Sequence, residues 1–178
     1  EIEKKPLKLS SIMRETLKLL RASIPTTIRI KERIREESDL ILADPTQIQQ
    51  VLMNLSTNAA YAMRDKGGML SIELSACRLT EGEIPDAVPG SYMRLVVRDT
   101  GVGIQPDAID KIFDPFFTTK QREEGTGLGL SVVHGIVHQC KGYIAVESKP
   151  GEGTTFSIYF PRIQEESGEN TLPEEAVP

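Results

Sequence analysis

The sequence has few cysteines and histidines, so it offers little material for several kinds of reactive site. Its two cysteines, Cys77 and Cys140, lie far apart with no His or Cys near them at metal-ligand spacing. We therefore expect two reduced, buried thiols of a cytosolic protein rather than a disulfide. His134 and His138 lack the Glu that follows the first His of a zincin motif, so we expect solvated or locally bonded imidazoles rather than a metal pair. No Ser/His/Asp set, Cys/His set or carboxylate pair suggests covalent or hydrolytic catalysis.

Long apolar runs and an excess of positive charge are also missing. No window reaches the ~18 consecutive apolar residues of a membrane-spanning helix, and there is no signal-peptide pattern. The formal charge is −5, but residues 164–178 hold five Glu and no Lys or Arg, which leaves 21 of the 26 acidic residues against all 21 basic ones in residues 1–163. This near-neutral part gives no reason to expect nucleic acid or an anionic membrane as a partner. We expect a cytoplasmic domain without direct membrane contact.

The length and the ends of the chain suggest one domain of a larger protein. The 178 residues can bury a single core. Because the chain begins at Glu1 rather than Met and ends in an acidic stretch with prolines, we expect a piece of a longer protein. The missing membrane span then does not describe the parent, which a membrane segment could anchor.

Helical and strand patterns alternate along the chain. Asp44 followed by Pro45 is a strong helix start, and apolar residues recur after it at helical spacing to about Arg64. Residues 143–148 and 155–160 have strand patterns on either side of a short glycine turn, which predicts a hairpin. With helices on one face only, the pattern predicts an α+β two-layer sandwich with a mixed, mostly antiparallel sheet. The other predicted elements are helices over about 10–21 and 131–139 and strands over 27–35, 40–42, 69–76 and 92–98.

Two glycine-rich turns, and the segment between them, are the most distinctive part of the sequence. The turns are Asp99-Thr100-Gly101-Val102-Gly103-Ile104 and Gly125-Thr126-Gly127-Leu128-Gly129-Leu130. Glycines let the backbone approach a phosphate closely, and the helical pattern after the second turn offers N–H groups to an anion. Each turn alone is more typical of a hinge, but together they indicate a nucleotide pocket. The segment 113–120 could be a movable cover with aromatic anchors and a cation, Lys120, or an exposed loop with solvated charges.

Three polar residues could hold a nucleotide and its metal. Asn54 and Asn58 lie four apart, on one flank of the apolar stripe of the helix predicted after Asp44. Their amide oxygens suit Mg²⁺, although a bond to a neighbouring side chain or to water is the commoner use of such residues. Asp99, at the end of a predicted strand, could accept the exocyclic amine of adenine or could cap its own turn.

Five segments, taken in order, resemble the N, G1, F, G2 and final G boxes of the ATP-binding catalytic domain of bacterial sensor histidine kinases. These segments are residues 54–59, 99–104, 113–117, 125–130 and 151–156. The resemblance covers about residues 9–162, and five boxes at compatible spacing are far more specific than any single one. The amino-acid sequence of residues 62–68 and 116–120 is most similar to that of the nitrogen-regulation-type subgroup.

The resemblance implies the Bergerat fold, shared with gyrase-, heat-shock-chaperone- and mismatch-repair-type ATPases, with ATP and Mg²⁺ as cofactors. In that family Asn58 would be the principal Mg²⁺ ligand and Asn54 its helper. Asp99 would hold adenine, with Thr154 supporting it through water. Lys120 would approach the phosphates from a lid over about residues 105–124. The base pocket would be shaped by Gly101, Gly103 and Ile104, and the triphosphate would be wrapped by Gly125, Thr126, Gly127, Leu128, Gly129 and Leu130.

Two departures from the wider family refine this expectation. In the ATP-hydrolysing relatives, the resemblance implies a Glu that activates water one helical turn before the metal-binding Asn. This sequence has Asn54 at that position, and an amide cannot act as a base at neutral pH. The resemblance therefore implies phosphoryl transfer to a histidine rather than hydrolysis. The phosphoacceptor histidine of the family, which is followed by an acidic residue on an upstream helical hairpin, does not occur here. The fragment alone is expected to bind ATP without phosphorylating itself.

The resemblance also implies an organisation and partners. Residues 1–8 would be the remnant of the connection to the hairpin, 9–162 the catalytic domain, and 163–178 an acidic linker. The partners would be the dimerisation and histidine-phosphotransfer domain of the same parent and the receiver domain of a response regulator. We expect this fragment to be monomeric, because dimerisation in the family belongs to the hairpin. Two rivals remain, an ATP-hydrolysing relative on the same fold and a degenerate nucleotide-binding scaffold.

Overall fold

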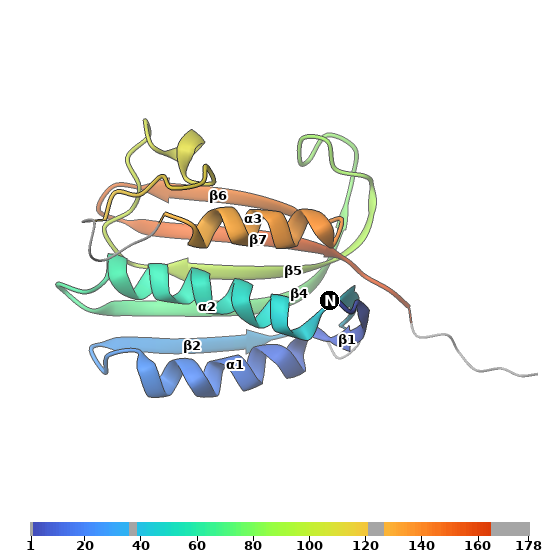
Figure 1. The fold of residues 1–178 in the computed structure, drawn as a ribbon, viewed down its shortest axis with the longest axis horizontal. Helices are drawn as coiled ribbons and strands as arrows, with labels where there is room; N and C mark the ends of the chain where they lie inside the picture. Colours follow the sequence, from blue (N-terminus) through green and yellow to red (C-terminus); the bar gives the residue numbers. More distant parts are fainter. Residues whose placement is uncertain (1, 36–38, 121–126, 165–178) are drawn as a thin grey trace, which may run out of the picture.

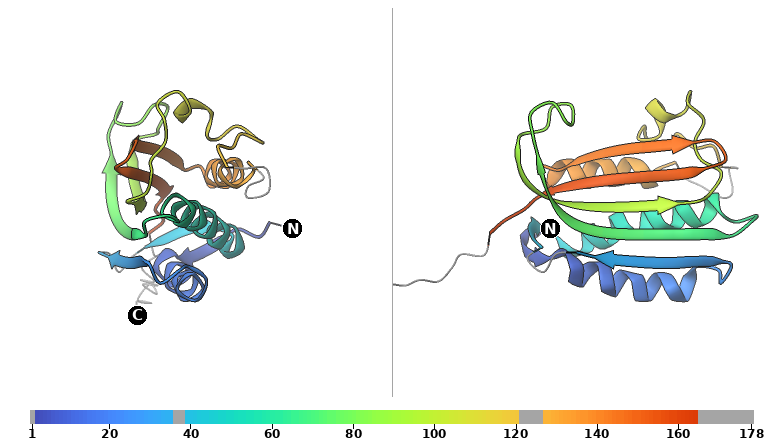
Figure 2. Two further views of the ribbon diagram at one scale, coloured as in Figure 1. Left: turned by 90° about the vertical axis from the view of Figure 1, so that its left-hand side faces the viewer. Right: turned by 180° about the vertical axis from the view of Figure 1, so that it is seen from behind.

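A five-stranded sheet forms one layer of the structure, and helices cover one of its faces (Figures 1 and 2). The computed structural model describes residues 2–35, 39–120 and 127–164. Its helices are α1 (Leu9–Ser23), α2 (Pro45–Ala62) and α3 (Gly129–Gln139), with a 3₁₀ turn η1 (Ile109–Lys111). Its strands are β1 (Lys5–Lys8), β2 (Ile28–Ile34), β3 (Leu40–Ala43), β4 (Gly68–Leu79), β5 (Gly90–Asp99), β6 (Tyr143–Lys149) and β7 (Gly153–Pro161).

The strands of the large sheet run in the order β2-β4-β5-β7-β6. Only the β2–β4 pair is parallel among these neighbours, and the other pairs are antiparallel. The hairpin predicted from the glycine turn is confirmed, because Val146 of β6 lies opposite Phe156 of β7. The predicted α+β two-layer sandwich with a mixed, mostly antiparallel sheet is therefore confirmed.

A second, two-stranded sheet near the N-terminus was not predicted. In it β1 pairs antiparallel with β3, with Leu7 opposite Ile41. The strands expected over 27–35 and 40–42 are both present, but they belong to different sheets. The pairing joins residues far apart in the sequence, so no local pattern announces it.

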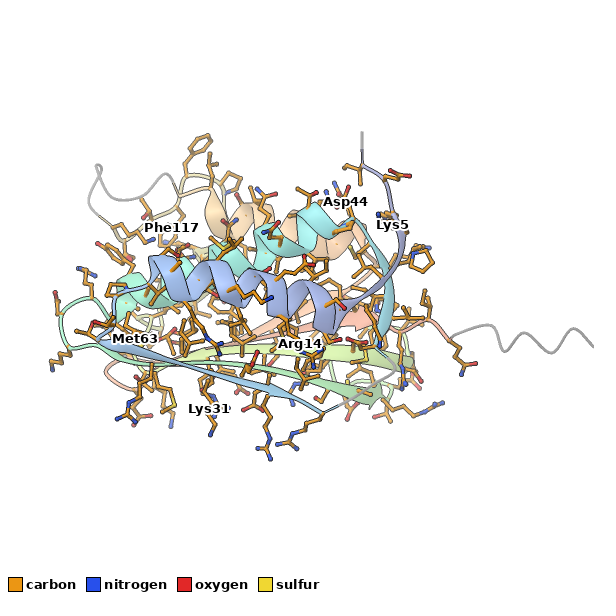
Figure 3. The ribbon with its side chains drawn as sticks, turned by 90° about the horizontal axis from the view of Figure 1, so that it is seen from below. Lys5, Arg14, Lys31, Asp44, Met63 and Phe117 are labelled. Atoms are coloured by element: carbon orange, nitrogen blue, oxygen red, sulfur yellow. The ribbon has the colours of Figure 1, made fainter. Side chains whose placement is uncertain are left out.

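The helix α2 lies between α1 and α3 and carries the polar residues of interest on one flank (Figure 1). The Asp44 carboxylate accepts the Thr46 N–H at 2.8 Å and Pro45 follows it, so the predicted helix start is confirmed. Asp44 and Met63 lie at the two ends of α2 (Figure 3). Leu52 of α2 is fully buried in the core. The buried face of the helix thus fixes the position of the flank that carries Asn54 and Asn58.

The cysteines and histidines lie much as the sequence indicates. Both cysteines are free, and Cys140 is buried. Cys77 departs from the prediction because it is only half-buried, on the face of β4 that points away from the helices. Lys31 of β2 also points away from the helices (Figure 3). His134 and His138 of α3 are both exposed, as expected for imidazoles outside a metal pair.

The start of α3 shows where the second glycine turn ends. The helix begins at Gly129, two residues before the predicted start at Ser131, and its buried residues include Val133 and Val137. In the part of the chain that the structure describes, no helix combines the length and the apolar character needed to cross a membrane.

Candidate functional site

A cavity of about 610 Å³ lies between α2, the start of α3 and the segment that follows β5. Its wall contains residues from every box that the sequence singled out. The predicted site residues that line it are Asn54, Asn58, Asp99, Gly103, Ile104, Lys120, Gly127, Gly129, Leu130 and Thr154. Gly101 and Leu128 do not line it, and Gly125 and Thr126 lie outside the described residues. The fold thus gathers ten predicted residues, which are far apart in the sequence, around one space.

One part of the cavity, the aspartate site, is formed by Asp99 and Thr154. Asp99 is the last residue of β5 and is only 6% exposed. Its Oδ1 accepts the N–H of Gly101 at 2.8 Å. Burial raises the pKa of the Asp99 carboxyl above its ordinary value, and the N–H groups of Gly101 and Thr154 lower it in part. Of the two roles considered for Asp99, the cap of its own turn is observed, and the side chain reaches the cavity as well.

A small polar network holds the chain beside the aspartate site. The hydroxyl oxygens of Ser148 and Thr154 are 2.8 Å apart. Ser148 Oγ accepts the N–H of Ile104 at 2.8 Å and donates to the carbonyl of Gly153 at 3.1 Å. The network ties the first glycine turn to the β6–β7 hairpin. Ser148 was not predicted, and an isolated serine in a strand gives no sequence signal for such a role.

The first glycine turn needs its glycines for close packing. A Cβ on Gly101 would lie 2.7 Å from both the Cβ and the carbonyl oxygen of Ala62 in α2. Gly101 therefore shapes the site from behind the cavity wall by letting the turn touch the helix. Gly103 has a φ of +74°, and its Cβ would lie 2.2 Å from the carbonyl oxygen of Lys149. Both positions exclude a side chain.

The substitution Gly103→Ala is expected to destabilise the fold by about 3–4 kcal/mol, from left-handed strain and overpacking together. Gly151→Ala is the matched control, because Gly151 has a φ of +80° but nothing within 4 Å of its Cβ. The control should cost only about 1–2 kcal/mol. Urea unfolding of both variants measures the difference, and equal losses would contradict the close-packing argument.

The other part of the cavity, the asparagine site, is formed by Asn54, Asn58 and Lys120. Asn54 Nδ2 donates to the carbonyl of Gly129 at 3.2 Å. Lys120 Nζ donates to Asn58 Oδ1 at 2.9 Å. The two asparagines therefore bond neighbouring groups, and Asn58 presents its amide oxygen to a positive charge. A neutral oxygen ligand of this kind suits Mg²⁺, so the donor set fits the ion that the resemblance implies.

The segment 113–120 lies against the second glycine turn. The Phe116 N–H donates to the Gly127 carbonyl at 3.0 Å, and a Cβ on Gly127 would lie 2.5 Å from the Phe116 backbone. Phe113 and Phe117 pack against the core, as expected of anchors. Phe116 does not, because it has a φ of +66° and is 75% exposed. Of the two alternatives for this segment, aromatic anchors describe Phe113 and Phe117, whereas an exposed loop describes Phe116.

Sequence reasoning missed one residue that the structure places at the asparagine site. Tyr61 lines the cavity, and Lys120 Nζ is 4.5 Å from the centroid of its ring. Tyr61 follows Asn58 by three residues, which puts the two on neighbouring positions of the α2 surface. That spacing was the signal that could have identified it.

Comparisons with known proteins identify the family of this chain. Residues 43–164 match the family described as histidine kinase-, DNA gyrase B- and HSP90-like ATPase. The chain is 39% identical over 175 residues to sensor kinase CckA of Brucella abortus (strain 2308), covering 94% of this chain and 18% of the relative. It is 43% identical over 121 residues to sensor histidine kinase ZraS of Escherichia coli (strain K12), covering 68% and 23%. The chain thus spans about a fifth of the length of these curated relatives.

Solved structures of histidine kinases have a similar fold. The crystal structure of full-length ShkA in complex with AMPPNP is 26% identical with a TM-score of 0.73, covering 93% of this chain and 32% of that one. The catalytic domain of histidine kinase ThkA, solved free of nucleotide, is 30% identical with a TM-score of 0.72, covering 90% and 96%. Taken with the family match over residues 43–164, these likenesses show that the chain belongs to the histidine kinase-, DNA gyrase B- and HSP90-like ATPase family.

Proposed function

We propose that this chain is the ATP-binding catalytic domain of a sensor histidine kinase. It binds ATP with Mg²⁺ and transfers the γ-phosphate to a histidine on a dimerisation domain outside this chain. The observation that carries the proposal is that one cavity joins a buried acceptor, Asp99, to the amide oxygen of Asn58 and the ammonium of Lys120. A base with an exocyclic amine suits the first, and a magnesium-bound polyphosphate suits the second.

The residues of the two sites divide the work of binding. Asp99 accepts the exocyclic amine of adenine, supported by Thr154, and Gly103 and Ile104 flank the base. Asn58, helped by Asn54, holds Mg²⁺, which neutralises charge on the triphosphate. The start of α3 at Gly129 lies in the cavity wall, and a helix N-terminus suits phosphate.

The chemistry we propose is transfer rather than hydrolysis. Hydrolysis needs a base beside the phosphates to activate water. Among the described residues that line the cavity, Asp99 is the sole carboxylate, and it caps its own turn at the aspartate site. At the asparagine site the cationic group is Lys120, which neutralises charge and positions the phosphate.

The wider setting also belongs to the proposal. We place the chain in the cytoplasm. We also place it in the nitrogen-regulation-type subgroup, because the sequence of residues 62–68 and 116–120 is most similar to that subgroup. Residues 1–8 lead to the dimerisation hairpin, 9–162 form the catalytic domain and 163–178 are an acidic linker. The partners are that hairpin and a receiver domain, and this chain alone is monomeric.

Calorimetry with ATP, with and without Mg²⁺, tests the proposal. We expect binding that Mg²⁺ strengthens, because Asn58 would hold the ion and the ion would neutralise charge on the triphosphate. A dimerisation domain with a phosphoacceptor histidine, fused upstream, should then become labelled on that histidine. No binding at millimolar ATP would favour the scaffold, and release of free phosphate without labelling would favour an ATP-hydrolysing relative.

A further inference from the structure

Two cationic side chains lie against the ring of Tyr61. The guanidinium carbon of Arg64 is 3.9 Å from the ring centroid, and Lys120 Nζ is 4.5 Å from it. Both distances are within the range in which an aromatic face attracts a cation. Of the two cations, Lys120 lines the cavity, whereas Arg64 is exposed on the surface and donates to the Tyr61 carbonyl at 3.0 Å.

Two side chains of α2 hold the same ammonium. Lys120 Nζ donates to Asn58 Oδ1 at 2.9 Å while it lies at the Tyr61 ring. Asn58 and Tyr61 are three residues apart, so they stand side by side on the helix. Lys120 comes from a segment 62 residues further along the chain. Two side chains of α2 thus contact the ammonium at the asparagine site.

The two contacts differ in what happens to them when a nucleotide is bound. In the proposed function, on which this inference rests, the amide oxygen of Asn58 would hold Mg²⁺. A metal there would compete with Lys120 for that oxygen, because the ion and the ammonium repel each other at short range. The face of an aromatic ring attracts a cation without offering an oxygen that a metal would take. Contact with Tyr61 can therefore continue while Asn58 holds the metal.

We propose that Tyr61 is a positioning residue that seats the Lys120 ammonium beside the bound magnesium polyphosphate. The ring keeps the ammonium close to the phosphates and lets the metal and the lysine occupy separate places. Tyr61 acts through Lys120 and touches no reacting atom. The contribution of the ring must therefore vanish when the ammonium is removed.

A double-mutant cycle on the full chain, measured by calorimetry with ATP and Mg²⁺, tests whether the Tyr61 ring positions Lys120. Tyr61→Leu should lower the affinity about 5-fold, within the range of a partly desolvated cation–π contact. In a Lys120→Met background the same change should alter the affinity less than about twofold. Tyr61→Phe keeps the ring and should restore the wild-type value. Arg64→Gln removes the other cation and should leave the affinity unchanged. Thermal unfolding of each variant shows that the fold is intact.

The outcomes separate this inference from the proposed function. If the wild type fails to bind ATP, the proposed function fails. If the wild type binds and Tyr61→Leu binds equally well, the positioning role of Tyr61 is contradicted while the proposed function stands. A loss of the same size in the Lys120→Met background also overturns it, because Tyr61 would then act through packing. So does an equal loss in Tyr61→Phe, because the hydroxyl rather than the ring would matter.

Discussion

Asp99→Asn is expected to lower the affinity for ATP about 100-fold, which corresponds to about 3 kcal/mol. The two oxygens of the carboxylate serve the N–H groups of Gly101 and Thr154 and, in our proposal, the amine of adenine. An asparagine has one acceptor oxygen and a donor in place of the other. That donor must face another N–H, so a buried polar contact becomes a repulsive one. Calorimetry of the wild type and the variant measures the loss.

Base selectivity provides the matched readout for the same change. Guanine presents a carbonyl oxygen where adenine presents its amine, and a carboxylate repels that oxygen. The wild type should therefore prefer ATP to GTP, and Asp99→Asn should lose most of the preference. An unchanged preference in the variant would mean that Asp99 serves only as the cap of its turn.

The buried carboxylate also predicts a pH dependence of stability with a definite sign. Burial raises the pKa of Asp99 in the folded chain, whereas the unfolded value is about 3.9. Between the two values the folded chain binds more protons than the unfolded chain, so raising the pH costs stability. Relative to Asp99→Asn, the wild type should lose stability as the pH rises from about 4 through the raised pKa. Urea unfolding of both proteins across this range checks the sign, and a rising difference would contradict it.

Sequence reasoning succeeded where the signals were local. Asp44 and Pro45 announced the start of α2, and helical spacing put Asn54 and Asn58 on one flank of it. The glycine turn predicted the β6–β7 hairpin. The resemblance of five boxes then indicated which distant residues meet, and ten of them do line one cavity.

The features that sequence reasoning did not predict depend on contacts that no local pattern encodes. The pairing of β1 with β3 places Leu7 opposite Ile41, and neither segment has a sequence pattern that identifies the other as its partner. The sequence indicated that Gly101 shapes the pocket, but it gave no sign that the residue does so by packing against Ala62 behind the cavity wall. Phe116 is a large apolar residue of the kind that anchors a segment to a core. Its backbone has a left-handed conformation, however, and its ring is exposed. In each case the outcome was decided by tertiary packing rather than by residue type.

Asn58→Ala should remove the effect of Mg²⁺ on ATP binding and reduce transfer to a supplied histidine by about 10³-fold, a loss typical of removing one preorganised electrostatic group. The cavity offers the metal a neutral oxygen at Asn58, and an alanine there offers none. ATP affinity without Mg²⁺ should change little, because Asp99 and its surroundings are untouched. Titrations at several Mg²⁺ concentrations separate the two effects.

Gln50→Ala is the matched control for Asn58→Ala. Gln50 also carries an amide on α2, but it is exposed and does not line the cavity. Its removal should leave the dependence on Mg²⁺ intact. If Asn58→Ala keeps the full dependence as well, the metal is held elsewhere. The role of that amide would then be its contact with Lys120, and the ammonium would need to neutralise more of the phosphate charge.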